Sequence, residues 1–208
     1  MRNTLLLPKY NLPDAKLIED NSFVYKYAVW VPAETAVIIG RSNKPENSAF
    51  LENTEEDNTP VYQRPSGGEA VVISPKTLVI SVAYNAPEQK QSTFYFKEYN
   101  ERIIRALESL GIKELKFEGI SDITLNGRKI LGCSIYRNKN KVFYHAVLNL
   151  SEDTGLLMRY LKFPGRTPEY RANRNHDDFV TSIKKEGFDI KTEAIKKAIA
   201  GEMLLPPH

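Results

Sequence analysis

Residues 120–136 read ISDITLNGRKILGCSIY and carry the clearest hairpin signal of the chain. In this stretch Asn126-Gly127 separates two apolar runs, 120–125 and 129–136, that we expect to be strands. An Asn-Gly pair readily adopts the two positive φ angles that a tight type I′ turn requires. The sequence therefore predicts two neighbouring antiparallel strands around this turn.

Further strands are expected on both sides of this hairpin. Short apolar runs rich in Val, Ile and Tyr, bounded by Gly, Pro or Asn, are typical of strands. Such runs lie at 27–31, 36–39, 61–64, 70–74, 78–84 and 142–150. We expect the first two to form a hairpin, the next three to form a meander, and the polar stretch 41–60 to be a surface loop.

Helical periodicity is clearest after Ser92, where apolar side chains recur at helical spacing until Gly111, a C-terminal stop. Further helices are expected at 154–161, 177–185 and 192–204, with a basic, irregular segment at 162–176. Runs of strands with helices between them predict an α+β fold. We expect a mixed, mostly antiparallel β-sheet flanked by helices, in a single domain spanning residues 1–208.

Composition excludes several classes of protein. The chain has 208 residues, of which 41% are hydrophobic, a composition that is ordinary for a globular protein. Its net charge of 29 − 26 = +3 is too small to indicate a nucleic-acid partner. The single cysteine, Cys133, excludes an internal disulfide and a multi-cysteine zinc site, and favours a reducing, cytoplasmic setting. No run approaches the ~18 apolar residues of a membrane span, so no membrane association is expected.

A glycine pair between two strands is the first candidate site. Within the segment 64–71, Gly67 and Gly68 permit positive φ and let backbone N–H groups approach an anion, while Arg64 offers a fork for phosphate or carboxylate. The same pattern also fits a plain glycine-containing hairpin turn, and local spacing leaves both interpretations open.

Three further side chains could carry chemistry. Lys129 follows the Asn-Gly turn on a strand, so its ammonium is held at a fixed height above the sheet unless it is a solvated edge lysine. Cys133 lies four residues further on, on the same expected face and roughly 13 Å away, which favours an inert buried thiol over a nucleophile paired with Lys129. His145, in an apolar strand, is either a satisfied semi-buried histidine or a ligand contact.

Five segments, taken in order, form a recognisable pattern. They are Val37-Ile38-Ile39-Gly40-Arg41, Arg64-Pro65-Ser66-Gly67-Gly68, Ile120-Ser121-Asp122-Ile123, Gly127-Arg128-Lys129-Ile130-Leu131-Gly132 and Tyr144-His145-Ala146-Val147-Leu148. In order and spacing they resemble the biotin/lipoate protein ligase superfamily and, within it, the lipoate–protein ligase A family, over roughly residues 27 to 185. The resemblance implies a class II synthetase-like catalytic domain.

The resemblance also implies an activity. Members of this family use ATP to convert lipoate to lipoyl-adenylate, and then transfer the lipoyl group to a lysine of a carrier domain, in a 2-oxoacid dehydrogenase E2 or the glycine cleavage H protein. Lys129 stands at the family's catalytic position, and Asp122 stands at an acidic position near the nucleotide, where it would act through Mg²⁺. The residues implied to bind nucleotide and acyl group are Arg64, Ser66, Gly67, Gly68, Glu69, Ala70, Val71, Val72, Asp122 and His145.

The chain departs from the family pattern in four ways. Glu69 replaces the third glycine of the loop, Ala146-Val147 replaces Gly-Thr after the histidine, and Ile73 and Ser74 stand where a histidine is usual. Long-form ligases also carry a C-terminal accessory domain, so the resemblance implies either that a separate accessory subunit supplies it here or that the reaction step differs.

These departures keep alternatives open. One is an octanoyl- or lipoyltransferase of the same superfamily, which would need Cys133 as a thioester-forming nucleophile. Another is a non-catalytic module that binds lipoyl groups or carriers. A biotin–protein ligase is disfavoured because its Gly-Arg-Gly-Arg-x-Gly-Arg loop is missing.

The basic segment 162–176 is a candidate docking site for an acidic carrier, unless it is an ordinary solvated loop. Its cations are Lys162, Arg166, Arg171 and Arg174.

Overall fold

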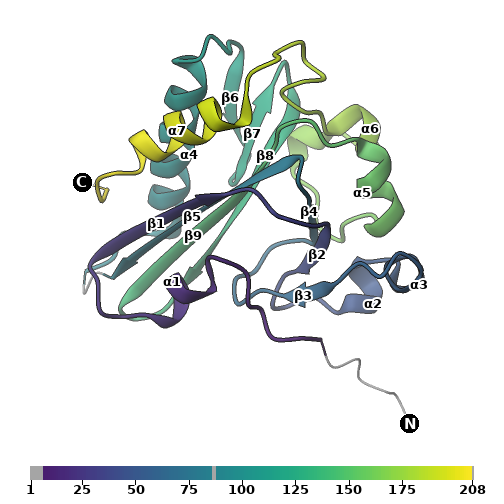
Figure 1. Cartoon of the computed structure of the whole chain (residues 1–208), viewed down its shortest axis with the longest axis horizontal. Helices are drawn as coiled ribbons and strands as arrows, with labels where there is room; N and C mark the ends of the chain where they lie inside the picture. The colour runs from purple at the N-terminus through teal and green to yellow at the C-terminus, as the bar shows by residue number, and fades with distance from the viewer. Residues whose placement is uncertain (1–6, 86–87, 208) are drawn as a thin grey trace.

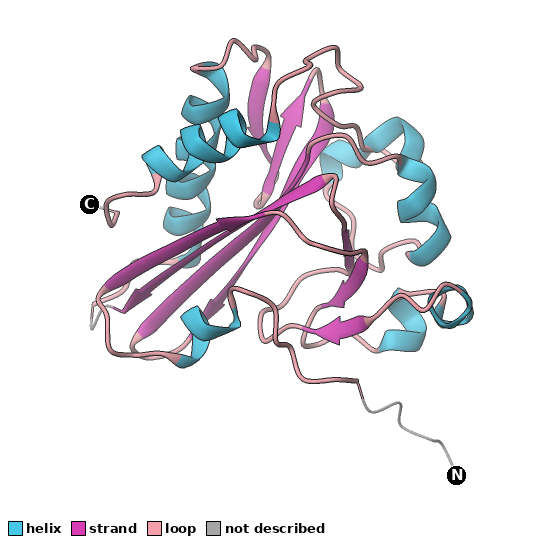
Figure 2. Ribbon diagram, viewed as in Figure 1, coloured by secondary structure: helices cyan, strands magenta, loops and turns pink. Residues whose placement is uncertain are grey.

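The computed structural model describes residues 7–85 and 88–207, and its central element is a six-stranded antiparallel sheet (Figure 1). This sheet confirms the predicted α+β class and the mostly antiparallel pairing. Helices flank the fan of strands on both sides (Figure 2). In spatial order, the strands are β1 (Tyr25–Trp30), β5 (Thr77–Asn85), β9 (Lys141–Asn149), β8 (Arg128–Arg137), β7 (Asp122–Leu125) and β6 (Leu115–Glu118).

Both predicted turns of the second half are confirmed. Asn126 and Gly127 have φ angles of 53° and 73° and connect β7 to β8, as a type I′ turn requires. In the next turn, the Asn138 side chain accepts hydrogen bonds from the backbone N–H groups of Asn140 and Lys141, which closes the β8–β9 hairpin. Strand β6 was not predicted, because its sequence LKFE contains only four residues, two of them charged.

A second, three-stranded sheet has the order β3 (Val61–Gln63), β2 (Ala36–Ile39) and β4 (Val71–Ile73), with one parallel and one antiparallel pairing. It corrects two predictions. Strands β1 and β2 do not form a hairpin, since β1 pairs with β5 in the large sheet. The predicted meander is also wrong, because β3 and β4 flank β2 while β5 leaves for the large sheet. All four residues of β2 are buried, as suits a central strand covered on both faces.

Helices α4 (Ser92–Glu108) and α7 (Thr192–Glu202) lie side by side against one face of the large sheet (Figure 1). Side chains alternate along β5, as strand geometry requires: Ile80 packs into the core beneath these helices, whereas Val79 packs with Ile38 of the small sheet. The two faces of the large sheet thus serve different purposes. One face anchors the helices, and the other faces the small sheet.

The remaining helices are short. The predicted loop 41–60 contains two of them, and the predicted helix 177–185 is helical only at its start. The chain leaves that helix at Val180, which bridges to Lys129, while the Thr181 N–H donates to the Lys129 carbonyl. No helix in the described residues is long and apolar enough to cross a membrane. These elements are α1 (Ala15–Glu19), α2 (Pro45–Ser48), α3 (Leu51–Glu56), α5 (Thr154–Tyr160), a 3₁₀ turn (Glu169–Arg171) and α6 (His176–Phe179).

Candidate functional site

An open cavity of about 1100 Å³ lies between the two sheets and is lined by residues of both. One part of its wall is apolar and belongs to a single packed cluster. The other part carries charged side chains from β7, β8 and the segment 162–180. The apolar residues are Tyr10, Leu12, Trp30, Ile38, Val71, Ile73, Val79 and Val147. Such a cavity suits a ligand with an apolar chain and an anionic head.

The sequence-predicted site residues converge on this cavity. All of them line it except Ser66, which is buried beside it. They come from the glycine loop and β4, from the adjacent strands β7 and β8, and from β9. Tertiary structure therefore brings these three parts of the chain together.

Arg64 organises the glycine loop from beneath. Its side chain is only 5% exposed, and its guanidinium donates to the carbonyls of Ile38, Gly67 and Glu69 and to the Ser66 hydroxyl, at 2.8–3.2 Å. Burial lowers the pKa of Arg64 to about 10. The expected free fork for phosphate is therefore corrected: the guanidinium is engaged by its own chain, and Arg64 acts on a ligand through the loop.

The loop lines the cavity and carries backbone donors that the described residues themselves do not use. Within the described chain, no backbone N–H between Ser66 and Ala70 donates a hydrogen bond to a protein group. Gly68 has a φ of 89°, a conformation that favours glycine. A Cβ on Gly40 would meet the Gly68 carbonyl oxygen at 1.9 Å, so the loop rests directly on this residue. Consecutive free N–H groups form a concavity suited to an anion.

His145 connects the loop to the large sheet. Its Nε2 lies 2.5 Å from the Ser66 hydroxyl and 2.6 Å from the Ser134 hydroxyl of β8. Burial, and to a smaller extent the charge of Arg64, hold the pKa of His145 well below its ordinary value. His145 is thus a neutral, hydrogen-bonded histidine that fixes the loop position and also lines the cavity.

Lys129 and Asp122 form an ion pair at the charged part of the wall. The Lys129 ammonium lies 2.9 Å from Asp122 Oδ1, and the Tyr170 hydroxyl donates to Asp122 Oδ2 at 2.7 Å. The ammonium also lies over Gly132, where a Cβ would come within 2.8 Å of it. The absence of a side chain at Gly132 therefore creates the space that the Lys129 side chain occupies.

The predicted relation between Lys129 and Cys133 is corrected by the strand geometry. The β7–β8 register shifts between Ile123 and Thr124, so β8 carries one extra residue between its pairs with these two. A bulge reverses the alternation of side chains beyond it. Cys133 packs against the main core beneath the helices, whereas Lys129 lies over Gly132, on the other face.

Cys133 has the properties of an inert thiol. Burial raises its pKa to about 12, and its sulfur donates to the Ser121 carbonyl at 2.9 Å. A thiol with so high a pKa supplies almost no thiolate at neutral pH. This agrees with the interpretation of Cys133 as a packing residue.

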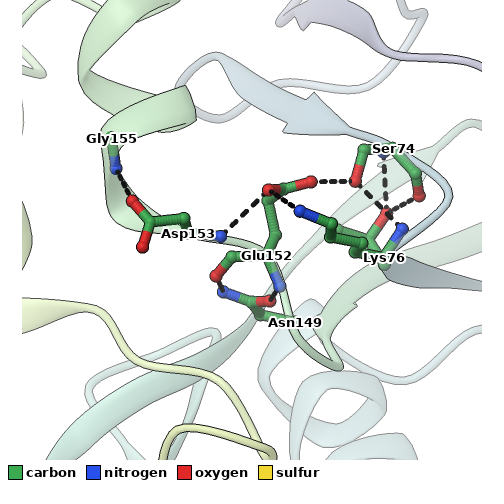
Figure 3. A network of polar contacts seen from close by, with 7 residues as sticks. Ser74, Lys76, Asn149, Glu152, Asp153 and Gly155 are labelled. Atoms are coloured by element: carbon green, nitrogen blue, oxygen red, sulfur yellow. Dashed lines mark hydrogen bonds and ion pairs between the residues drawn. The ribbon is translucent and has the colours of Figure 1, made fainter.

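A polar network holds α5 against the cavity (Figure 3). The buried Glu152 carboxylate accepts from the Ser74 hydroxyl at 2.5 Å and from the Asp153 N–H at 2.9 Å, and Lys76 lies 3.5 Å away. Asn149 exchanges two hydrogen bonds with the backbone of Glu152. Ser74, where the resembling family usually carries a histidine, thus serves to connect β4 to the start of α5.

The basic segment 162–176 is only partly available for docking. Arg171 is buried, and Arg174 donates to the carbonyls of Gly127, Tyr170 and Arg171. Arg174 therefore orders the segment and Arg171 lies inside it, which corrects the expectation that all four cations face a carrier. Arg166 is exposed, and Lys162 donates to the Glu46 carbonyl.

Several site residues were missed by sequence reasoning alone. Tyr170 and Ser134 approach the site only through tertiary contacts with Asp122 and His145, so no local pattern reveals them. Gly40 and Gly132 lie within quoted motifs, and their lack of a side chain was the available signal. Among the described residues, no group of three or more His, Cys, Asp or Glu side chains could hold a metal ion.

Comparison with known proteins identifies the family of this chain. The chain matches the family model described as the lipoyl protein ligase A/B catalytic domain over residues 20–204. It is 30% identical over 123 residues to lipoate-protein ligase LplJ of Bacillus subtilis, and 28% identical over 127 residues to lipoate–protein ligase 1 of Staphylococcus aureus. The aligned regions cover 59% and 61% of this chain, but only 36% and 38% of those two proteins.

Solved structures share the fold. A lipoate-protein ligase A bound with ATP superposes with a TM-score of 0.76 at 20% identity, covering 95% of this chain and 81% of that one. A bipartite ligase from Thermoplasma acidophilum, described with its E2 lipoyl domain, gives 0.76 at 19% identity, covering 94% and 80%. LipL1 of P. falciparum in complex with lipoate gives 0.69 at 21% identity, covering 90% and 52%. Because the match to the family model covers residues 20–204 of this chain, the chain belongs to the lipoyl protein ligase A/B catalytic-domain family.

Proposed function

We propose that this domain is an ATP-dependent lipoate–protein ligase, which forms lipoyl-adenylate and transfers the lipoyl group to a lysine of a carrier domain. The observation that carries the proposal is the Lys129 ammonium, held by Asp122 in a cavity that also contains an apolar wall and a loop with free N–H groups. This combination matches an acyl chain, a carboxylate and a phosphate group in one ligand.

The proposed reaction has two steps. A lipoate carboxylate oxygen attacks the α-phosphorus of ATP and pyrophosphate leaves, which gives the mixed anhydride lipoyl-adenylate. The carrier lysine amine then attacks the acyl carbonyl, AMP leaves, and the amine loses a proton as the amide forms. Negative charge grows on phosphoryl oxygens in the first step and on the carbonyl oxygen in the second. A fixed ammonium at Lys129 stabilises both.

The surrounding residues position these groups. Asp122 and Tyr170 hold the ammonium in place, and Arg64 and His145 hold the loop whose N–H groups would bind phosphate oxygens. The Mg²⁺ ion that accompanies ATP commonly binds one or two protein carboxylates together with the phosphates of the substrate. Asp122 is the carboxylate that would take this part, and Lys129 and Tyr170 engage its two oxygens in this structure.

The alternatives have less support. A transferase would need a nucleophilic thiol, and burial raises the pKa of Cys133 to about 12. A non-catalytic binding module is favoured by Glu69, whose carboxylate lies 3.4 Å from the Asn43 amide at the cavity, where the resembling family has glycine. The adenylate assay described below separates this module from the ligase.

We propose carrier domains of the E2 or H-protein kind as partners and the cytoplasm as the setting. A similar fold is found in a ligase described with its E2 lipoyl domain, which supports the carrier class. The described residues would act as one catalytic domain. A separate accessory subunit stays part of the proposal, because one ligase of similar fold is described as bipartite.

Lipoate-dependent exchange of labelled pyrophosphate into ATP tests the first step without a carrier. The proposal predicts exchange that requires lipoate and Mg²⁺. Binding of lipoate without any exchange, at saturating ATP, would contradict the ligase and favour the binding module.

A further inference from the structure

Arg171 is a buried cation without an acidic partner. It ends the 3₁₀ turn Glu169–Arg171, is 3% exposed and lies among the residues that line the cavity. Its Nε donates to the Arg174 carbonyl at 2.9 Å. Within residues 7–85 and 88–207, neither terminal nitrogen donates a hydrogen bond, Nη2 is buried, and no carboxylate lies within ion-pair distance. Four of the five N–H donors of the guanidinium are therefore unused.

Aromatic rings hold this guanidinium in place without satisfying its N–H groups. The rings of Phe163 and Phe179 lie 4.4 Å and 4.8 Å from Cζ of Arg171. Cation–π contacts of this kind engage the face of a guanidinium, whereas its donors point outward in its plane. Buried charges in proteins are ordinarily paired. The arrangement is thus pre-organised and lacks its counter-ion.

The guanidinium and the Lys129 ammonium line the same cavity. The segment that carries it is tied to β8, because the Thr181 N–H donates to the Lys129 carbonyl. His176 lies near both cations: burial lowers its pKa, and the positive charges of Arg171 and Lys129 lower it further. Asp122 pairs with the Lys129 ammonium, whereas the Arg171 guanidinium has no paired carboxylate among the described residues, so an anionic ligand would neutralise its charge.

We propose that Arg171 binds a phosphate group of the nucleotide, an inference that rests on the proposed ligase function. A planar guanidinium with free N–H groups on its edge is suited to two-point contact with phosphate oxygens. Its burial in the cavity favours a small anion over an acidic side chain of a docking carrier. The lipoate carboxylate offers similar chemistry, so the test must distinguish polyphosphate from carboxylate.

Three variants address the proposal. Arg171→Gln removes the charge, and Arg171→Lys keeps the charge but loses the planar fork. The control is Arg105→Gln, which removes an exposed arginine of α4 that pairs with Glu202 outside the cavity. For each, the KM values for ATP and for lipoate are measured by pyrophosphate exchange. The shift in melting temperature caused by inorganic tripolyphosphate provides a readout that needs no turnover.

The expected result is a rise in the KM for ATP of about tenfold or more in Arg171→Gln, since hydrogen bonds to charged groups are among the stronger ones. Arg171→Lys should lie between Arg171→Gln and the wild type. The KM for lipoate should stay within about twofold, tripolyphosphate should no longer stabilise Arg171→Gln, and Arg105→Gln should behave as the wild type.

Three results would overturn the inference: an unchanged KM for ATP, a rise confined to lipoate, or equal rises for both substrates together with lost stability. If Arg171→Gln does not fold, Arg171→Lys decides, and a wild-type KM for ATP in that variant would overturn the inference. A wild-type protein without exchange activity contradicts the proposed function instead, while the tripolyphosphate shift still tests Arg171.

Discussion

A single methyl group added at Gly132 tests whether the position of the Lys129 ammonium matters. In Gly132→Ala, the new Cβ would lie 2.8 Å from Nζ and 2.9 Å from Cε of Lys129. Ordinary contacts begin at 3.4 Å, so the ammonium must retreat by at least 3.4 − 2.8 = 0.6 Å. A displacement of ~1 Å at a reacting centre can cost on the order of 100-fold in rate. We therefore expect kcat for adenylate formation to fall roughly 10- to 100-fold.

Stability should not fall with the rate in this variant. The methyl group meets the far end of a flexible side chain, and alanine is favoured over glycine in a strand by about 0.5–1 kcal/mol. The assay is pyrophosphate exchange at saturating ATP and lipoate, together with a thermal melt. Gly201→Ala is the matched control, because a Cβ there meets nothing within 4 Å. A Gly132→Ala enzyme with the wild-type rate would refute the role given to the ammonium.

Three further predictions concern other residues. Lys129→Ala should abolish adenylate formation, measured by trapping with hydroxylamine, and activity within a few-fold of wild type would reject the assignment. Lys129→Arg should also be impaired, because a planar fork does not replace a point charge. Cys133→Ala should keep its ligation activity, measured on a lipoyl domain, and an acyl-thioester trapped on Cys133 would instead favour the transferase. The pKa of His145 in the folded state lies well below its ordinary value of 6.5. As the pH falls below 6.5, the unfolded state therefore binds more protons than the folded state, and the protein loses stability. Urea melts at pH 8 and pH 5 should therefore show a smaller loss in His145→Gln than in wild type, and equal losses would contradict this.

The features that sequence predicted correctly depend on local structure. The Asn126-Gly127 turn was predictable because its two positive φ angles suit those residues and involve no distant partner. The long helix beginning at Ser92 was predictable because its buried face repeats at helical spacing. The expectation that Lys129 and Asp122 share one site came from the family resemblance, and the hairpin places them on neighbouring strands.

The features that sequence missed depend on distant contacts. Strand β2 takes its neighbours from residues 61–63 and 71–73, and the adjacent run at 25–30 pairs elsewhere, which no local pattern reveals. The bulge in β8 moved Lys129 away from the face of Cys133. The direction of the Arg64 fork was set in part by the Ile38 carbonyl, 26 positions earlier.

The proposed activity is the ATP-dependent attachment of lipoate to a carrier lysine. It can be measured by mass spectrometry of a purified lipoyl domain incubated with this protein, ATP, Mg²⁺ and lipoate. We expect a mass increase of one lipoyl group that requires ATP and is lost with Lys129→Ala. A carrier whose mass is unchanged, although lipoate and ATP both bind, would contradict it.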